Sequence, residues 1–152
     1  MNRDKVFTLY LTLISLLGML FAFIVTYRFG PGLTTDGARY LSTAENLING
    51  NGFTEYLGVP LTQFPPLYSI VIAAVGLFTR SDVFAIAQFV NIFSFGLTIW
   101  LGGKFFRRLF PGNFLYAYIG STVFVTSFSL LRMASNVLSD LMFLALTIVI
   151  LI

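Results

Sequence analysis

Long apolar segments constrain what this chain can fold into more than any other feature of its sequence. After the basic residues Arg3 and Lys5, an apolar run extends from Val6 to about Tyr27. Roughly 22 residues in a helix can cross the hydrocarbon core of a membrane, which is about 30 Å thick. A signal peptide has a shorter apolar region and a small-residue cleavage site, which this run lacks. We therefore expect an uncleaved transmembrane helix over about residues 6–27, and its basic start favours a cytoplasmic N-terminus.

The composition supports the membrane class and excludes several kinds of chemistry. The chain is 57% hydrophobic and 10% charged, whereas a soluble domain has about 25% charged residues. The absence of Cys and His excludes disulfides, zinc sites built from thiolates or imidazoles, and acid–base catalysis by histidine. Proton transfer must therefore use carboxylates, Tyr or Lys. The net charge of +3 comes from the ends of apolar segments, so we expect no nucleic-acid partner.

Four further apolar runs predict an all-α, polytopic transmembrane helix bundle. Residues 83–103 and 114–131 are long enough to span a membrane. Residues 65–78 and 141–152 are shorter, with about 14 and about 12 residues, and neither is long enough for an ordinary span. We expect residues 65–78 to lie at the membrane interface and residues 141–152 to be a truncated helix. The chain would then be the N-terminal part of one larger transmembrane module.

The position of residues 65–78 decides the topology. If this segment crosses the membrane, the three basic residues of segment 104–108 lie outside the cytoplasm. If it does not cross, they join the N-terminus in the cytoplasm, which the positive-inside rule prefers. The second arrangement also puts Asp36 and Asp140 on the same, outer side. The first arrangement stays open because short tilted spans exist.

The polar interval between residues 28 and 63 contains three of the six acidic residues: Asp36, Glu45 and Glu55. Apolar residues recur at helical spacing from residue 36 to residue 49, and the sequence NGNG ends that stretch. We predict an amphipathic helix that lies along the membrane interface within an extracytoplasmic first loop. Asp36 would lie in its first turn, at the positive end of the helix dipole.

Asp36 and Asp140 each have two interpretations. Asp36 is either a helix cap or an acid of the first helical turn, with Arg39 as an ion-pair partner, or it removes a proton from a hydroxyl acceptor or binds it, with Tyr40 packed beside it. Asp140 either shares with Ser139 the capping of the last helix, or converges with Asp36. Convergence would serve acid–base chemistry or a divalent cation held by oxygen ligands.

Other polar residues beside or within the apolar segments are weaker candidates. Arg39, Arg80 and Arg132 could each hold a phosphate group by paired hydrogen bonds, although an arginine beside a membrane segment more often pairs locally or extends its charge to the interface. Gln88 and Asn91 lie one turn apart in a spanning segment. For them we predict interhelical hydrogen bonds, with a substrate path as the minor alternative.

The order of motifs carries a family resemblance. The first-loop acid Asp36 is followed by Tyr40, Ala44, Asn46-Leu47, Gly50-x-Gly52-Phe53 and Phe64-Pro65-Pro66-Leu67-Tyr68. This order resembles the C-type membrane glycosyltransferases, in particular the branch related to protein O-mannosyltransferases and lipid A aminoarabinose transferases. The run Leu131-Arg132-Met133-Ala134-Ser135-Asn136 followed by Ser139-Asp140 resembles the second acidic motif of the same superfamily.

The resemblance implies a glycosyltransferase of a bacterial inner or cell membrane. Such an enzyme moves a sugar from a polyprenyl-phosphate donor to a protein, lipid or glycan acceptor outside the cytoplasm, with inversion at the anomeric carbon. By this analogy Asp36 is the base that activates the acceptor, and Asp140 helps to bind the acceptor or a cation. The cofactor is left open: a divalent cation is a candidate, but the sequence requires none. The implied substrate-binding residues are Arg39, Tyr40, Pro65, Pro66, Tyr68 and Arg132.

The chain departs from the family pattern at two positions. Many relatives have two adjacent acids where this chain has Asp36-Gly37, which weakens a metal role there, and no residue is assigned to a metal. Some have Lys or His before the double proline, where this chain has Gln63 and Phe64, so the ligand of the donor phosphate is unidentified. The alternative function is a small non-catalytic membrane subunit for interaction or transport, in which Asp36 and Asp140 are only helix caps.

Overall fold

Helices form the regular structure of residues 3–152, which are the residues that the computed structural model describes. The helices of this part of the chain are α1 (Arg3–Thr26), α2 (Thr35–Ile48), α3 (Leu67–Thr79), α4 (Val83–Leu109), α5 (Phe114–Thr126), α6 (Phe128–Ala134) and α7 (Asp140–Leu151). Two isolated backbone bridges, and no strand, occur in the same residues. The expectation of an all-α fold is confirmed.

Two helices are long and apolar enough to cross a membrane. They are α1, with 24 residues, and α4, with 27 residues. At a rise of 1.5 Å per residue, both exceed the roughly 30 Å of a hydrocarbon core. The helices α5 and α6 meet at an angle of 51° and would supply a third span if they act as one broken helix. The helices α3 and α7 are apolar but shorter, as the sequence predicted for these two segments.

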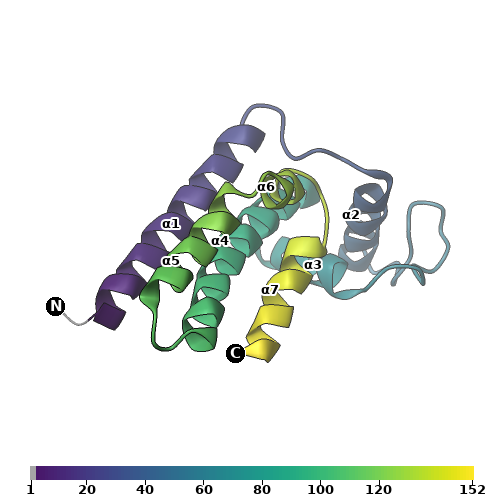
Figure 1. Ribbon diagram of the computed structural model, residues 1–152. Coiled ribbons are helices and arrows are strands. Elements are labelled where there is room, and N and C mark those ends of the chain that lie inside the picture. Colours follow the sequence, from purple (N-terminus) through teal and green to yellow (C-terminus); the bar gives the residue numbers. More distant parts are fainter. Residues whose placement is uncertain (1–2) are drawn as a thin grey trace.

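The helix α4 is the central element, and α1 runs antiparallel to it. Lys104, near the end of α4, donates a hydrogen bond to Thr8 near the start of α1, with an Nζ–Oγ1 distance of 3.1 Å. At the other end, Gln88 donates from Nε2 to Oγ1 of Thr26 over 2.8 Å. Figure 1 shows α1, α4 and α5 side by side as the long part of the molecule.

Small residues allow α1 and α4 to approach closely. A Cβ atom added to Gly18 would lie 2.4 Å from the side chain of Ile99, and one added to Gly96 would lie 2.5 Å from Met19. Helices in lipid gain little from hydrophobic contact with each other, because lipid tails are equally apolar, and close backbone approach therefore contributes much of their packing. The two glycines thus fix the register of the central helix pair.

Two boundaries differ from the sequence prediction. The segment expected as one helix over residues 114–131 is broken at Ser127, which has extended backbone angles and accepts a hydrogen bond from the amide of Leu130 over 3.4 Å. Ser127 therefore caps a new helix inside an apolar run. The helix expected over residues 83–103 continues to Leu109, because the basic residues of its last turn favour the negative end of the helix dipole.

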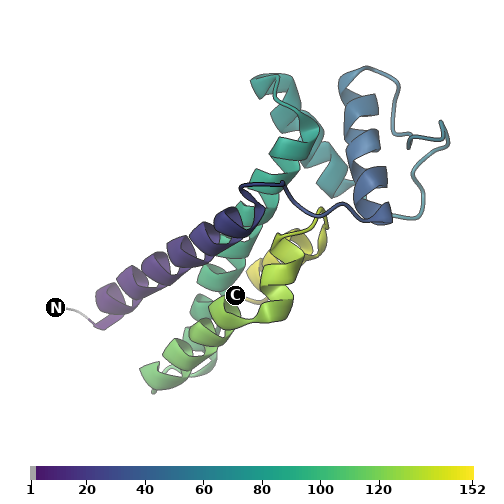
Figure 2. The same cartoon turned by 90° about the horizontal axis from the view of Figure 1, so that it is seen from above.

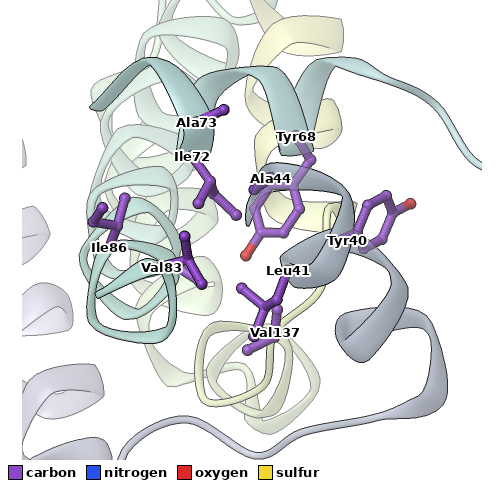
Figure 3. Packing of buried hydrophobic residues seen from close by; sticks show 10 residues of the cluster. Tyr40, Leu41, Ala44, Tyr68, Ile72, Ala73, Val83, Ile86 and Val137 are labelled. Carbon is purple, nitrogen blue, oxygen red and sulfur yellow. The ribbon is translucent and has the colours of Figure 1, made fainter. Parts of the chain in front are cut away.

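The interfacial helices predicted over residues 36–49 and 65–78 correspond to α2 and α3, which lie together to one side of the long helices (Figure 2). Their shared core contains Tyr40, Leu41, Tyr68 and Ile72 together with Val83 and Ile86 of α4. Figure 3 shows Tyr68 within this cluster and Tyr40 at its edge. The loop between α2 and α3 projects outward from the molecule (Figure 1).

The ends of the bundle carry different charges. The three basic residues of segment 104–108 lie at the same end as the start of α1, because α1 and α4 are antiparallel. The segments that contain Asp36 and Asp140 meet beyond the other end of α1, where Gly32 pairs with Asn136. This arrangement is the one expected if residues 65–78 do not cross.

Candidate functional site

Asp36 lies at the start of α2, but another residue caps this helix. Thr34 has extended backbone angles, and its Oγ1 accepts a hydrogen bond from the amide of Gly37 over 3.0 Å. Asp36 is exposed, and within residues 3–152 its carboxylate forms no hydrogen bond or ion pair. Asp36 is therefore neither the cap of α2 nor a partner of Arg39, but its interpretation as an acid of the first helical turn is confirmed. Its charge still lies at the positive end of the helix dipole.

Asp140 is the first residue of α7, and neither it nor Ser139 caps that helix with its side chain. The Ser139 hydroxyl instead shares a hydrogen bond with the phenol of Tyr40, with 3.0 Å between the oxygens. Asp140 is exposed and, within the described chain, forms no hydrogen bond or ion pair. The capping interpretation of these two residues is wrong as well. The partnership of Ser139 with Tyr40 was not visible in the sequence.

Backbone pairing brings the segments of the two acids together. Gly32 donates from its amide to the carbonyl of Ser135 over 2.7 Å and accepts from the amide of Val137 over 2.9 Å. One turn into α2, a Cβ atom at Gly37 would lie 2.7 Å from the carbonyl oxygen of Val137. A side chain at position 37 would force α2 away from the segment before Asp140. This contact is the physical reason why a second acid does not fit beside Asp36.

Tyr40 lies where the two acidic segments meet. Burial raises the pKa of its phenol; the hydrogen bond with Ser139 opposes this, and the nearby carboxylates of Asp36 and Asp140 raise the pKa further. Both carboxylates therefore lie within electrostatic range of one phenol. The ring of Tyr40 is fixed by an edge contact with Tyr68, with 5.1 Å between ring centroids.

Tyr68, Pro65 and Pro66 were expected to bind substrate, but Tyr68 is buried and the two prolines are exposed. Tyr68 is fully buried and donates its hydroxyl to Oδ1 of Asn91 over 2.9 Å. Nδ2 of Asn91 in turn donates to the carbonyl of Asn136. Tyr68 is thus a core residue that connects α3, α4 and the segment before Asp140. Pro65 and Pro66 are exposed, and Pro66 immediately precedes α3.

Gln88 and Asn91 form the interhelical hydrogen bonds that the sequence predicted. Gln88 bonds to Thr26 of α1, and Asn91 accepts from Tyr68 of α3. Because these amides are occupied by neighbouring elements, they hold the bundle together.

Arg39 pairs locally. Its Nε lies 3.2 Å from Oε2 of Glu55, an ion pair that is not aligned as a hydrogen bond. Its Nη1 donates to Oε1 of Gln63 over 3.0 Å, and the guanidinium lies 5.5 Å from the ring centroid of Phe64. Glu55 is 7% exposed, so this pair connects the projecting loop to α2. No sequence pattern indicated that Glu55 is buried.

Arg132 differs from Arg39. It is exposed at the end of α6 and forms no ion pair within residues 3–152. Its side chain lines a pocket of about 310 Å3 together with residues from the segments that precede Asp36 and Asp140. Of the predicted substrate-binding arginines, Arg132 is the one whose charge is not neutralised by a neighbour in the described chain.

The largest concavity lies away from the acids. It is a groove of about 680 Å3 between α3, α4 and α7, and its lining includes Phe89, Phe93 and Leu146 but no charged side chain. Such a surface is typical of contact with lipid tails or with other helices. The described residues also contain no group of three His, Cys, Asp or Glu side chains that could hold a metal ion.

The site therefore consists of two exposed carboxylates, one buried phenol within their electrostatic range, and an arginine without an ion pair in the described chain, which lines a nearby pocket. Comparisons of this chain with protein-family models, with curated proteins and with solved structures found no match.

Proposed function

We propose that this chain carries the acidic site of an integral membrane glycosyltransferase. The enzyme would transfer a sugar from a polyprenyl-phosphate donor to a hydroxyl acceptor at the outer face of the membrane. One observation carries the proposal: the segments of Asp36 and Asp140 meet through the backbone bonds of Gly32, and neither carboxylate is used for a hydrogen bond or an ion pair within residues 3–152. The motif order that resembles C-type glycosyltransferases supports it.

The proposed reaction needs one base and one leaving group. Asp36 accepts the proton of the acceptor hydroxyl, and the oxygen forms a bond to the anomeric carbon of the donor sugar. The bond between this carbon and the phosphate oxygen breaks, and its electron pair stays on the polyprenyl phosphate. Attack from the face opposite the phosphate inverts the anomeric carbon. An exposed carboxylate that no other group occupies is suited to this role.

Asp140 and Tyr40 have supporting roles in the proposal. Asp140 accepts a hydrogen bond from a second hydroxyl of the acceptor and thereby orients it. The raised pKa of Tyr40 keeps its phenol protonated near neutral pH, so it acts as a hydrogen-bond donor and not as a base. Its bond with Ser139 holds the segment of Asp140 against α2.

The proposal needs no step through a divalent cation. Two carboxylates are the only acidic groups at this site, and a third ligand from His, Cys, Asp or Glu is absent among the described residues. Gly37 occupies the position at which many members of the resembled family have a second acid next to the one that corresponds to Asp36.

The charges of the bundle support an outer location for the acids. Five of the nine basic residues lie at the end that contains the start of α1 and the end of α4, whereas the other four lie with Asp36 and Asp140 at the opposite end. Cytoplasmic ends of membrane helices are enriched in Lys and Arg. We therefore place the N-terminus in the cytoplasm and both acids outside it.

Cysteine labelling tests this location directly, because the chain contains no cysteine of its own. The variants Asp36→Cys and Asp140→Cys are exposed to a membrane-impermeant maleimide on intact cells, with Lys5→Cys as the control from the opposite end. Both acid positions should be labelled, and position 5 should react only after the membrane is opened. Labelling of positions 36 and 140 from opposite sides would overturn the proposed site.

The alternative of a non-catalytic membrane subunit assigned the two acids to helix capping. Thr34 caps α2, and no side chain caps α7, so in this alternative the two acids would serve only as first-turn acids that favour the helix dipole. The glycosyltransferase proposal gives both carboxylates a role.

A further inference from the structure

The two ends of the bundle differ in net charge. Residues 3–8 and 104–118, which we call the basic end, contain five of the nine basic residues and one of the six acidic residues, a net charge of +4. The opposite end contains four basic and five acidic residues, a net charge of −1. Figure 1 shows the start of α1 beside the turn from α4 to α5. The excess of positive charge is therefore confined to one end.

The fold uses part of this charge. Nη2 of Arg107 lies 3.5 Å from Oδ1 of Asp4, the one acid of the basic end. Lys104 donates from Nζ to Oγ1 of Thr8 over 3.1 Å and lies 5.1 Å from the ring centroid of Trp100. These two cations connect α4 to α1, and the nearby acid is already paired.

Three other cations of the basic end have no such role. Arg3, Lys5 and Arg108 are exposed, and none of them forms an ion pair within residues 3–152. Because Asp4 pairs with Arg107, their charge is available to an anion from outside the chain.

One of these cations, Arg3, lines a pocket between α1 and α5. The pocket has a volume of about 290 Å3, and its other lining residues are Val6, Phe114 and Tyr118. Val6 follows Arg3 by about one helical turn, and Tyr118 follows Phe114 in the same way. Both helices thus lead from a charged side chain at the end of the bundle to apolar and aromatic ones further along it. A phospholipid has the same order, a charged phosphate followed by acyl chains.

The surroundings of the pocket favour an anionic phospholipid. A positively charged choline or ethanolamine group would find no free carboxylate at the basic end, because Asp4 pairs with Arg107. A soluble phosphate ester would leave the apolar lining in contact with water, whereas an acyl chain would cover it. Basic residues beside membrane helices attract anionic lipids, and α1 and α4 are long and apolar enough to place this end in a membrane.

We propose that the basic end binds an anionic phospholipid of the leaflet in which α1 begins. Arg3 holds the phosphate by paired hydrogen bonds, and the apolar lining of the pocket contacts the first part of an acyl chain. Lys5 and Arg108 add attraction at longer range without contact to the phosphate. The inference uses no residue of the acidic site, so it is independent of the proposed sugar transfer.

Trp100 supplies the readout for a binding titration. It is the one tryptophan of the chain, and it packs on the same side-chain cluster as Phe114 and Tyr118. The full chain is reconstituted in phosphatidylcholine bilayers, and phosphatidylglycerol with brominated acyl chains, which quench tryptophan emission on contact, is added in rising mole fraction. Quenching should saturate at a low mole fraction, whereas brominated phosphatidylcholine should quench only in proportion to its abundance. Identical quenching by the two lipids would overturn the inference.

Variants of two neighbouring cations separate the pocket from diffuse attraction. In about 1 M NaCl the Debye length is about 3 Å, so charges that do not contact the lipid are screened. Arg3→Gln should then raise the mole fraction for half-maximal quenching about fivefold or more, because it removes charge-assisted hydrogen bonds. Lys5→Gln removes the same charge from a residue outside the pocket and should raise it less than about twofold. Equal shifts in these two variants, or no shift in Arg3→Gln, would overturn the pocket.

Further controls test the fold and the source of the phosphate. Arg3→Lys should bind better than Arg3→Gln, because it keeps the charge but not the paired geometry. The side chain of Arg3 is exposed, so both variants should keep the helical content of the unchanged chain, measured by circular dichroism. Arg80→Gln, at the opposite end, should leave the titration unchanged. Millimolar glycerol 3-phosphate should not relieve the quenching, and relief by this soluble ester would overturn the lipid assignment.

Discussion

Glu55 and the pair Asp36 and Asp140 belong to the same polar end of the protein, yet the fold uses them in opposite ways. Glu55 is almost fully buried, lies 3.2 Å from the guanidinium of Arg39, and anchors the projecting loop to α2. Asp36 and Asp140 are exposed and have no bonding partner in residues 3–152, although each lies at the start of a helix.

The difference separates an acid that stabilises the fold from acids that are available for chemistry. A buried carboxylate requires a partner, because an unpaired buried charge is strongly unfavourable. An exposed carboxylate at a helix start gains only a small stabilisation from the helix dipole. We therefore assign the two exposed acids to ligand binding and Glu55 to stability. The four predictions below test this distinction.

The largest expected effect is on catalysis by Asp36. Asp36→Asn keeps the shape of the side chain but cannot accept the proton of the acceptor, so sugar transfer by the full chain should fall by about 10²–10⁴-fold. The free energy of unfolding should change by no more than about 0.5 kcal/mol, because the side chain is exposed and unbonded. Transfer is measured from a polyprenyl-phosphate-linked sugar, and unfolding by denaturant titration in mild detergent.

Glu45→Gln is the matched control, because Glu45 is another exposed acid of α2. It should leave both transfer and stability unchanged. Near-normal transfer in Asp36→Asn would contradict the assignment of this residue as the base.

The next largest effect is expected at Gly37, which allows the two acidic segments to meet. The added methyl group of Gly37→Ala would lie 2.7 Å from the carbonyl oxygen of Val137. Overpacking of this kind costs about 1–3 kcal/mol, and the separation of α2 from the segment before Asp140 should also lower transfer. Gly112→Ala is the control, because nothing lies within 4 Å of the added atom. Equal stability of the two variants would show that the contact at Gly37 is not tight.

A smaller loss of stability is expected when the buried ion pair is broken. Glu55→Ala leaves the guanidinium of Arg39 partly buried without its partner, which should cost about 1–2 kcal/mol. Because Glu55 lies outside the acidic site, the transfer rate of the folded fraction should stay near normal. Denaturant titration and transfer assays on the same preparation measure both quantities. A variant that unfolds normally but loses transfer would place Glu55 among the functional acids.

The smallest effect concerns alkaline pH. The folded pKa of Tyr40 is raised above its usual value of about 10, so the folded protein holds this proton more tightly than the unfolded chain. This contribution to stability is complete below about pH 10 and is lost as the pH rises through the folded pKa. Between about pH 9 and about pH 11, the unfolding free energy of Tyr40→Phe should therefore fall less than that of the unchanged chain.

Tyr56→Phe is the control for this titration, because Tyr56 is an exposed tyrosine of the neighbouring loop. It should keep the pH dependence of the unchanged chain. If Tyr40→Phe had the same pH dependence as the unchanged chain, the phenol of Tyr40 would not be buried near the two carboxylates in solution.

Local features of the fold follow from the sequence, because they depend on segments that are close along the chain. The apolar run after Arg3 and Lys5 predicts α1, and the helical spacing before the sequence NGNG predicts α2. Gly50 and Gly52 have positive φ angles of 77° and 78°, as a helix-ending turn requires. The break at Ser127 was missed because an apolar run gives no signal when a serine caps a helix inside it.

Contacts between distant segments could not be read from the sequence. No local pattern connects Ser139 with Tyr40, Glu55 with Arg39, or Tyr68 with Asn91, since each pair joins separate elements. The same limit explains why Tyr68 was expected to bind substrate, whereas its hydroxyl is used inside the core.

The sequence by itself determined that the chain is helical, that two segments are long enough to span a membrane, and that Asp36 and Asp140 begin helices. Length, apolar content and helical spacing are sufficient for these conclusions. Only the tertiary structure decided that both acids lie within electrostatic range of Tyr40, that Thr34 caps α2 in place of Asp36, and that Ser139 bonds to Tyr40 and does not cap α7. The physical reason is that a carboxylate can be identified as having no hydrogen bond or ion pair only when the bonding partners of all neighbouring polar groups are known.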